Sequence, residues 1–206
     1  MRFGYLDTNT LTGVKPKFKL NARRQFLSME ELASLWRAAE CLSAAQKSAF
    51  RMLMLLPLRK QELLLSGWQN VDRQWLFVPG ERTKNHEESA LFMSDFAFSI
   101  LQAPANEIDL LFTANNQTPL TLGTKISVKL TEESGVSGWV YHDFRRTFST
   151  HMNERGHPFH IIEACLNHRD PTRRGVAGVY NRAEYRAAKQ TVLQAWSDLV
   201  EEAVAD

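Results

Sequence analysis

The sequence predicts a mainly α-helical protein with a small antiparallel β-sheet, an α+β fold. Three observations lead to this prediction. Apolar residues recur at helical spacing in several segments, serine-led capping boxes open two of those segments, and two strand-like runs flank a polar turn that starts with Pro-Gly. With 206 residues and 44% hydrophobic side chains, the chain has enough apolar material for the core of one large domain.

Capping boxes predict the first two helices. Ser28 with Glu31 opens a helix that runs to about Ala39, and Ser43 with Gln46 opens a second that ends at the next proline. Leucine, phenylalanine, methionine and tryptophan side chains at helical spacing give both segments an apolar face. We expect both helices to form part of the core.

The middle of the chain reads as a short helix followed by a sheet. Residues 61–66 are helical in pattern and stop at Gly67. Residues 75–78 and 90–93 are the two predicted strands, and the connection between them contains ERTKNHEES. We therefore expect a small antiparallel sheet with a polar turn.

The second half of the chain is predicted to be helical. Ser94 and Thr121 are the expected caps of two helices, and residues 143–155 and 158–166 form two more. Residues 183–203 form a long amphipathic helix. The side chains expected to face inward are Phe144, Phe148 and Met152 in one helix, and Tyr185, Ala188, Val192, Trp196 and Leu199 in the last.

The charged residues are unevenly distributed. Residues 1–25 hold six basic side chains and a single acid, Asp7, so we interpret them as a basic linker or arm ahead of a folded domain at 26–206. On this observation alone, a solvated tail explains such a run better than a dedicated binding arm does. The net charge of +2 and the pI near 8.6 permit nucleic-acid binding without requiring it.

Cysteine usage and hydropathy predict a soluble intracellular protein, which we expect in the cytoplasm. Cys41 and Cys165 have no metal-type spacing, and we expect both thiols to be reduced. The sequence shows no signal peptide and no long apolar run, so we expect no membrane role.

The segment YHDFRRTFST, residues 141–150, concentrates chemistry near the expected start of a helix. His142 and Arg145 lie three residues apart, on neighbouring positions of one turn. A helix N-terminus favours anions, and a guanidinium supplies a fork of donors suited to phosphate oxygens. Taken alone, the segment is better explained by a basic helix end exposed to water, or by His142 as an ordinary capping residue.

Three further segments carry the remaining candidates. Arg59 lies in LPLRKQELLL, His168 in LNHRD, and Tyr180 in GVYNRAEY. Together with HDFRRT, these motifs and their order resemble those of the tyrosine recombinase family. The residues within the motifs are most similar to those of phage and genomic-island integrases. The resemblance runs from about residue 24 to about residue 200.

The resemblance implies a recombinase-type catalytic domain at 26–206 that acts on double-stranded DNA without cofactor, metal or ATP. The tyrosine hydroxyl, here Tyr180, attacks a phosphodiester, expels a 5′-hydroxyl and leaves a covalent 3′-phosphotyrosine. Arg59, Arg145 and His168 are implied to stabilise the phosphate, and His142 to assist proton transfer at the nucleophile.

The implied proton donor to the leaving oxygen is Lys84, in the turn RTKN between the predicted strands. Lys60 and Lys125 are the competing lysines, and an ordinary exposed hairpin lysine remains the alternative. Two features depart from the family pattern: Asn167 stands where a glycine is usual before His168, and the stretch from there to the tyrosine is longer than in many relatives.

Further tyrosines and arginines have less specific expected roles. Tyr5, Tyr141 and Tyr185 compete for the nucleophile, but Tyr185 fits a packing residue and Tyr141 a brace for the pocket. The candidate contacts to neighbouring phosphates are Arg82, Arg146, Arg173 and Arg174.

Two other functions compete with strand transfer. A metal-dependent phosphohydrolase is suggested by the His142-Asp143 pair and by His151, His157 and His160, although no clear ligand shell accompanies them. A DNA-binding integrase remnant without catalysis is the other.

The resemblance also implies assembly on DNA. Relatives self-associate in a recombination synapse, and the stripe Val192, Trp196 and Leu199 either contacts another protomer or folds onto its own core. Relatives also place DNA-binding domains before the catalytic domain, whereas only the basic segment precedes the first helix here. We therefore expect weak, salt-sensitive DNA binding.

Overall fold

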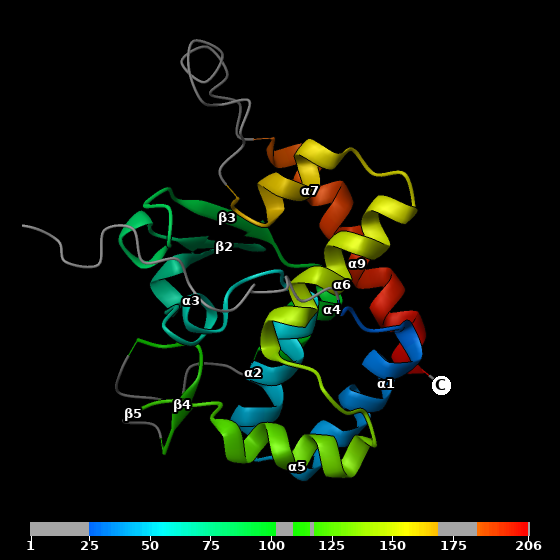
Figure 1. Ribbon diagram of the computed structural model, residues 1–206. Coiled ribbons are helices and arrows are strands. Elements are labelled where there is room, and N and C mark those ends of the chain that lie inside the picture. Colours follow the sequence, from blue (N-terminus) through cyan, green and yellow to red (C-terminus); the bar gives the residue numbers. More distant parts are fainter. Residues whose placement is uncertain (1–24, 102–108, 116–117, 169–184, 206) are drawn as a thin grey trace, which may run out of the picture.

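The computed structural model describes residues 25–101, 109–115, 118–168 and 185–205. Helices make up most of this part, and a three-stranded antiparallel sheet lies along one side, as Figure 1 shows. The predicted α+β class is therefore confirmed.

The first two helices begin where their capping boxes predict. Helix α1 spans Met29–Ala38 and α2 spans Ala44–Leu55, with a 3₁₀ turn, η1, at Ala39–Cys41 between them. Ser28 Oγ accepts the Glu31 N–H at 3.1 Å while the Glu31 carboxylate accepts the Ser28 N–H at 2.9 Å. The pair Ser43 and Gln46 repeats this reciprocal arrangement.

Helix α3, Lys60–Leu64, starts one residue earlier and stops two residues earlier than predicted. A second 3₁₀ turn, η2, follows at Trp68–Asn70. Gly67 lies so close to a neighbouring loop that a Cβ on it would come within 2.1 Å of the Asp109 carbonyl oxygen. Only glycine permits this approach, which fixes the exit of the chain from α3.

The main sheet has the order β1-β2-β3, formed by Val71–Asp72, Trp75–Val78 and Ser89–Phe92. Strands β2 and β3 pair antiparallel with Trp75 opposite Phe92 and Val78 opposite Ser89, which confirms the predicted hairpin. Its buried face carries Leu76, Val78 and Leu91. The connection between the strands contains the 3₁₀ turn η3, Gly80–Arg82.

One predicted cap is right and one is wrong. Ser94 Oγ accepts the Ala97 N–H at 3.0 Å and caps α4, Asp95–Ile100. Thr121 caps nothing, because α5 spans Thr124–Ser134 with Gly123 at its N-cap. Leu120 and Leu122 are buried on either side of Thr121, and this burial keeps the segment extended up to the glycine. A small second sheet, β4 (Thr113–Ala114) and β5 (Thr118–Pro119), lies just before it.

Of the last three helices in the described part of the chain, two line the candidate site. Helix α6, Tyr141–Glu154, begins two residues earlier than predicted and is followed by Gly156 at φ +78. Helix α7, Phe159–Cys165, follows Pro158 as expected. Helix α9 spans Arg186–Ala205, and residues 183 and 184 of the predicted helix lie outside the described residues.

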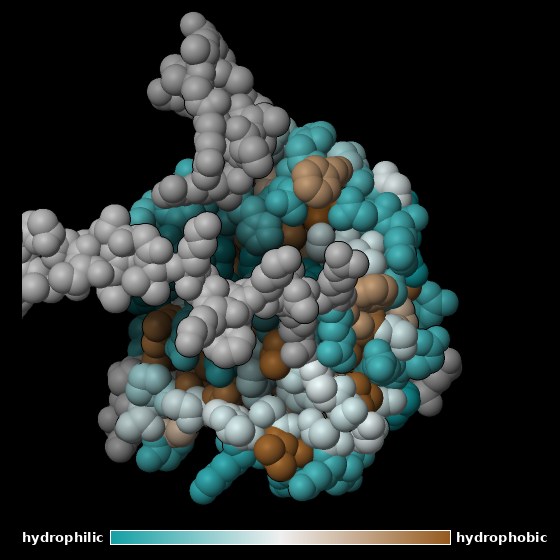
Figure 2. All heavy atoms as spheres, in the orientation of Figure 1, coloured by the Kyte–Doolittle hydropathy of each residue, from teal (hydrophilic) through white to brown (hydrophobic). Residues whose placement is uncertain are grey.

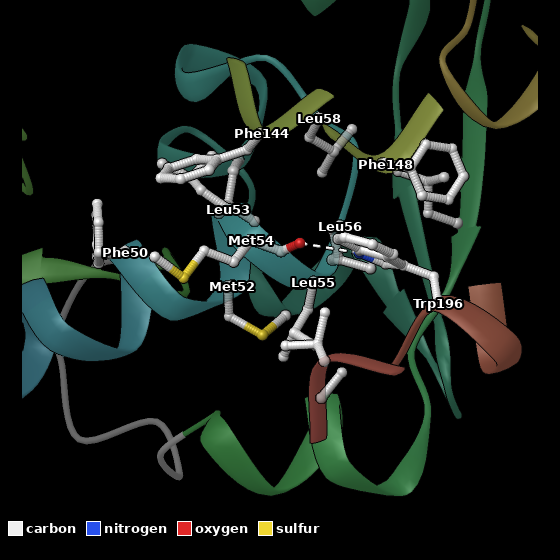
Figure 3. Packing of buried hydrophobic residues seen from close by; sticks show 14 of the residues in the cluster. Phe50, Met52, Leu53, Met54, Leu55, Leu56, Leu58, Phe144, Phe148 and Trp196 are labelled. Atoms are coloured by element: carbon white, nitrogen blue, oxygen red, sulfur yellow. Dashed lines mark hydrogen bonds between the residues drawn. The ribbon is translucent and has the colours of Figure 1, made fainter. Parts of the chain in front are cut away.

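The core is built around α2, α6 and α9. Figure 3 shows Phe50, Leu53 and Met54 of α2 facing Phe144 and Phe148 of α6, together with Trp196 of α9. The Trp196 indole N–H donates to the Met54 carbonyl oxygen at 2.9 Å, one of the carbonyls left unpaired at the end of α2.

The apolar stripe of α9 folds onto its own chain. The helix packs against α1, α7 and β3, and both Val192 and Trp196 are buried there.

Hydrophilic side chains predominate on the visible surface around α7 in Figure 2. Among the described residues, no helix has both the length and the apolar composition to span a membrane.

Candidate active site

Arg145 is the centre of the candidate site. It projects from the second turn of α6, and only 3% of the residue is exposed. Its Nη2 donates to the Leu166 carbonyl oxygen at 2.6 Å, and its Nη1 donates to the Pro57 carbonyl oxygen. The guanidinium thus ties together the end of α7 and the loop between α2 and α3.

The charge of Arg145 is buried, and the carboxylates of Glu62 and Glu163 act on it electrostatically from a distance rather than as ion-pair partners. Among the described residues, none of its nitrogens forms an ion pair, and its Nε has no hydrogen-bond partner. Burial, followed by the positive charge of Arg59, lowers the pKa of Arg145 to about 10, so the group remains protonated at neutral pH. A buried cation held mainly by carbonyl dipoles is a strong site for an anion.

His168 lies directly beside this guanidinium. Its Nε2 is 3.2 Å from Arg145 Nη2, and its Nδ1 is 3.0 Å from the Glu163 carboxylate. Because arginine only donates, Nε2 is the acceptor and Nδ1 carries the proton that Glu163 accepts. Glu163 therefore orients the ring, a role that the sequence did not reveal because the residue lies one helical turn before the LNH motif.

Arg59 enters from the loop that Arg145 holds. It is the N-cap residue of α3, and its Nη1 donates to Glu62 Oε1 at 2.6 Å. Glu62 is buried, and its second oxygen accepts the Arg59 main-chain N–H at 2.9 Å. The Arg-x-x-Glu spacing of the sequence thus lets Glu62 accept from both the main chain and the side chain of Arg59, which fixes the direction of Arg59.

His142 is the second residue of α6 and is exposed at the rim of the site. Partial removal from water, and then the positive charges of Arg145, Arg146 and Arg59, lower the pKa of His142. The imidazole is consequently biased toward its neutral, proton-accepting form.

The arrangement also bears on the alternatives in which His142 is a helix cap or a metal ligand. Asp143 is fully buried, and its oxygens accept the Val140 N–H at 2.9 Å and the Arg146 Nη1 at 2.6 Å. Asp143 is therefore the cap of α6 and the anchor of Arg146. Across the described residues, no group of three or more His, Cys, Asp and Glu side chains has a metal-binding arrangement.

The candidate residues of α6 and His168 line an open cleft of about 290 Å³. The full lining consists of His142, Arg145, Arg146, Ser149, Thr150, Glu163, Leu166 and His168. The fold thus brings His142, Arg145 and His168 to one surface, with the charge of Arg59 close enough to act on the first two.

The hairpin candidates lie beside this cleft. Lys84 is exposed in the turn between η3 and β3, between two buried neighbours, Thr83 and Asn85. Arg82 is exposed and donates from Nη1 to the Leu65 carbonyl oxygen, which joins the turn to α3. Strand β3 packs against α7, so the turn and His168 belong to one side of the molecule.

The competing side chains are engaged elsewhere. Lys60 donates to the Leu122 carbonyl oxygen at 2.9 Å and lies 4.6 Å from the centre of the Tyr141 ring. Tyr185 is partly buried and makes an edge contact with His160. Burial raises the pKa of Tyr141 to about 12, which is unfavourable for a nucleophile. Tyr5, Arg173, Arg174 and Tyr180 lie outside the described residues.

Comparison with known proteins supports the resemblance. The model of the phage integrase family matches residues 25–186. Prophage integrase IntA of Escherichia coli K12 is 26% identical over 195 residues, covering 91% of this chain and 45% of the relative. The integrase of Shigella phage Sf6 is 27% identical over 190 residues, covering 87% of this chain and 48% of the relative. The chain therefore spans about half the length of these relatives.

Solved structures share the fold. The XerA recombinase superposes with a TM-score of 0.61 at 19% identity, over 86% of this chain and 66% of the other. A lambda integrase dimer bound to a COC' core site gives a TM-score of 0.63 at 18% identity, over 89% of this chain and 54% of the other. Because the family model covers most of the sequence and the fold agrees, the chain belongs to the phage integrase family, the tyrosine recombinases.

Proposed function

We propose that this chain is a site-specific recombinase that cuts and rejoins double-stranded DNA through a covalent 3′-phosphotyrosine at Tyr180. The observation that supports this most directly is the buried guanidinium of Arg145, which lines a cleft beside His168 without an ion-pair partner among the described residues. A scissile phosphate supplies the missing negative charge.

The proposed step is a transesterification that conserves the number of phosphoester bonds. The bond from Tyr180 Oη to phosphorus forms while the bond from phosphorus to the 5′ oxygen breaks. His142 accepts the tyrosine proton, and Lys84 donates a proton to the departing oxygen. Arg59 and Arg145 donate to the non-bridging oxygens, where preorganised donors stabilise the transition state by roughly 3 kcal/mol each. His168 adds a further donor when its Nε2 carries a proton and faces the phosphate in place of Arg145.

Rejoining is the reverse of this step with a different 5′-hydroxyl, so no cofactor, metal ion or ATP enters the reaction. Exchange between two duplexes requires a second copy of the chain on the partner DNA. Self-association on DNA is therefore part of the proposal, and a lambda integrase tetramer bound to a Holliday junction has the same fold.

The test uses a pool of nicked duplexes with a randomised core. A short strand released beside the nick diffuses away, so a cleaved strand stays attached to the protein. We expect an adduct that survives denaturing electrophoresis, forms in the presence of EDTA, and carries its nucleotide on the peptide containing Tyr180. Sequencing of the attached strands identifies the preferred site.

The matched control is Tyr180→Phe, which removes a single hydroxyl. The proposal predicts that this variant binds the recovered duplex and forms no adduct. Binding by the unsubstituted chain with no adduct would favour the non-catalytic DNA-binding module. An adduct that persists in Tyr180→Phe and disappears in Tyr141→Phe or Tyr185→Phe would refute the assignment of the nucleophile, and an adduct that depends on a divalent metal would support the phosphohydrolase.

A further inference from the structure

Two asparagine side chains join the hairpin turn to the end of α7. Asn85 Nδ2 donates to Asn167 Oδ1 at 3.0 Å and to the Asn167 carbonyl oxygen at 3.1 Å. In return, Asn167 Nδ2 donates to Asn85 Oδ1 at 3.3 Å and to the Glu87 carbonyl oxygen at 3.2 Å. We call this reciprocal arrangement of Asn85 and Asn167 the amide pair.

Each member of the amide pair is the direct chain neighbour of a candidate catalytic residue. Asn85 follows Lys84 in the hairpin turn, and Asn167 precedes His168, which contacts Arg145. Asn85 is only 9% exposed, whereas Lys84 is exposed to solvent. The turn is thus anchored through one buried amide while the adjacent ammonium group is free to point outward.

The backbone at Asn167 explains why an asparagine fits there. Its φ is +48, in the left-handed region that glycine adopts freely and that asparagine tolerates better than most other residues. Glycine would satisfy the backbone equally well but would form none of the side-chain hydrogen bonds. The asparagine therefore keeps the shape of the turn and adds a connection to the hairpin.

We propose that the amide pair is a positioning device that holds the Lys84 turn in register with the phosphate site formed by Arg145 and His168. This inference rests on the proposed function, in which Lys84 protonates the leaving 5′ oxygen. A general acid acts only within hydrogen-bonding distance of that oxygen, so a turn free to move would spend less time in reach.

The rest of the hairpin turn is held by the hydrogen bond from Arg82 to the Leu65 carbonyl oxygen at the end of α3 and by local contacts. Thr83 Oγ1 lies 3.0 Å from the Gly80 carbonyl oxygen and 2.9 Å from that of Glu87, both within the same connection. These contacts shape the turn but do not place it relative to α7. Among the described residues, the hydrogen bonds between this turn and the segment of His168 are those of the amide pair.

The experiment compares two forms of the duplex recovered from the adduct selection, one with the normal 5′ oxygen and one with sulfur at the bridging 5′ position. A thiolate leaves without protonation, so cleavage of the sulfur duplex does not need a general acid. A defect in positioning Lys84 therefore slows the oxygen substrate selectively, whereas a general structural defect slows both.

The principal variant is Asn167→Gly, which removes the side-chain hydrogen bonds and retains a residue suited to the backbone. We expect adduct formation to slow about tenfold on the oxygen duplex and less than about twofold on the sulfur duplex. Asn85→Ala should likewise slow the oxygen duplex more than the sulfur duplex. Agreement between the two variants shows that the effect does not come from a folding defect in one of them. Lys84→Ala removes the proposed acid itself, so it should slow adduct formation on the oxygen duplex more than either asparagine variant does. It should leave the rate on the sulfur duplex nearly unchanged.

Asn115→Gly is the matched control, because Asn115 also has a left-handed backbone, at φ +50, but lies between β4 and β5. It should cleave both duplexes like the unsubstituted chain. Equal loss on both duplexes in Asn167→Gly and Asn85→Ala, or no loss on either, would overturn the inference. An unsubstituted chain that cleaves neither duplex would overturn the proposed function itself, and an unselective loss in Lys84→Ala would remove Lys84 from both proposals.

Discussion

Arg59 Nη1 and Glu62 Oε1 are 2.6 Å apart, and the same carboxylate caps the main-chain N–H of Arg59. One buried acid therefore fixes both the backbone and the side chain of a candidate phosphate-binding residue. Since Arg59 is about a quarter exposed, at 26%, solvent screens part of this interaction.

Glu62→Gln tests this relationship. The amide still accepts the Arg59 N–H but loses the ion pair, so we expect the free energy of unfolding to fall by about 1–2 kcal/mol. Adduct formation should fall as well, because the guanidinium is no longer directed. Urea unfolding and the adduct assay measure the two effects. Glu81→Gln, at an exposed position of η3, is the control, and an equal loss of stability there would contradict the argument.

Trp196→Phe tests the link between the first and last parts of the core. The substitution keeps an aromatic ring but leaves the Met54 carbonyl oxygen without its indole donor, so we expect a loss of about 1–3 kcal/mol in urea unfolding. The control is Trp68→Phe, because the buried Trp68 indole N–H has no hydrogen-bond partner among the described residues. A control that costs as much as Trp196→Phe would show that ring volume, rather than the hydrogen bond, is decisive.

The lowered pKa of His142 makes stability depend on pH. The unfolded chain binds a proton at this residue at a higher pH than the folded chain does, so unfolding becomes easier as the pH falls through about 6.5. His142→Gln removes this contribution. Between pH 7.5 and 5.5 we expect its Tm to fall less than that of the unsubstituted chain, by on the order of 1–2 °C. An equal fall in Tm for both proteins would show that His142 does not carry this pH dependence.

Tyr141→Phe separates a packing tyrosine from a nucleophile. The Tyr141 hydroxyl is buried and has no hydrogen-bond partner among the described residues, so its removal should leave the free energy of unfolding unchanged or raise it by up to about 1 kcal/mol. The ring contact with Lys60 is retained by phenylalanine. We expect the adduct to form, and its loss would instead give Tyr141 a direct part in the reaction.

DNA binding by this chain is expected to weaken steeply with salt. Each phosphate contact contributes about −0.9 to the slope of log K against log salt concentration. If Arg82 contacts a phosphate, Arg82→Gln makes the slope of log K against log salt concentration less steep by about 0.9, the contribution of one contact. A filter-binding series in rising salt measures this slope. Arg37→Gln, on the exposed end of α1, is the control and should leave the slope unchanged. A slope that is insensitive to both substitutions would exclude Arg82 from the DNA interface.

Local signals in the sequence predicted much of the fold. The capping boxes at Ser28 and Ser43 and the hairpin strands depend on residues a few positions apart, and all were found. Thr121 failed as a cap because burial of the leucines on both sides determined the backbone. A capping residue can be recognised locally, but the burial that overrides it depends on the whole fold.

The candidate site was predictable only in part for the same reason. Motif order identified Arg145 and His168, and the structure brings them together. The carbonyl oxygens that hold Arg145, however, come from Pro57 and Leu166, 88 and 21 positions away. The amide pair joins residues 82 positions apart, and asparagine in a turn gives no sign of a distant partner. The roles of Tyr180 and Lys84 remain predictions.

The hydrogen bond from Trp196 to Met54 spans 142 positions, which has a consequence for the order of events during protein synthesis. The ribosome adds Arg59, Arg145 and His168 before α9. A nascent chain therefore already carries these groups while its core still lacks the packing that α9 provides. Completion of α9 then closes that core. We therefore expect a chain that stops before α9 to carry these groups without the core that supports their alignment.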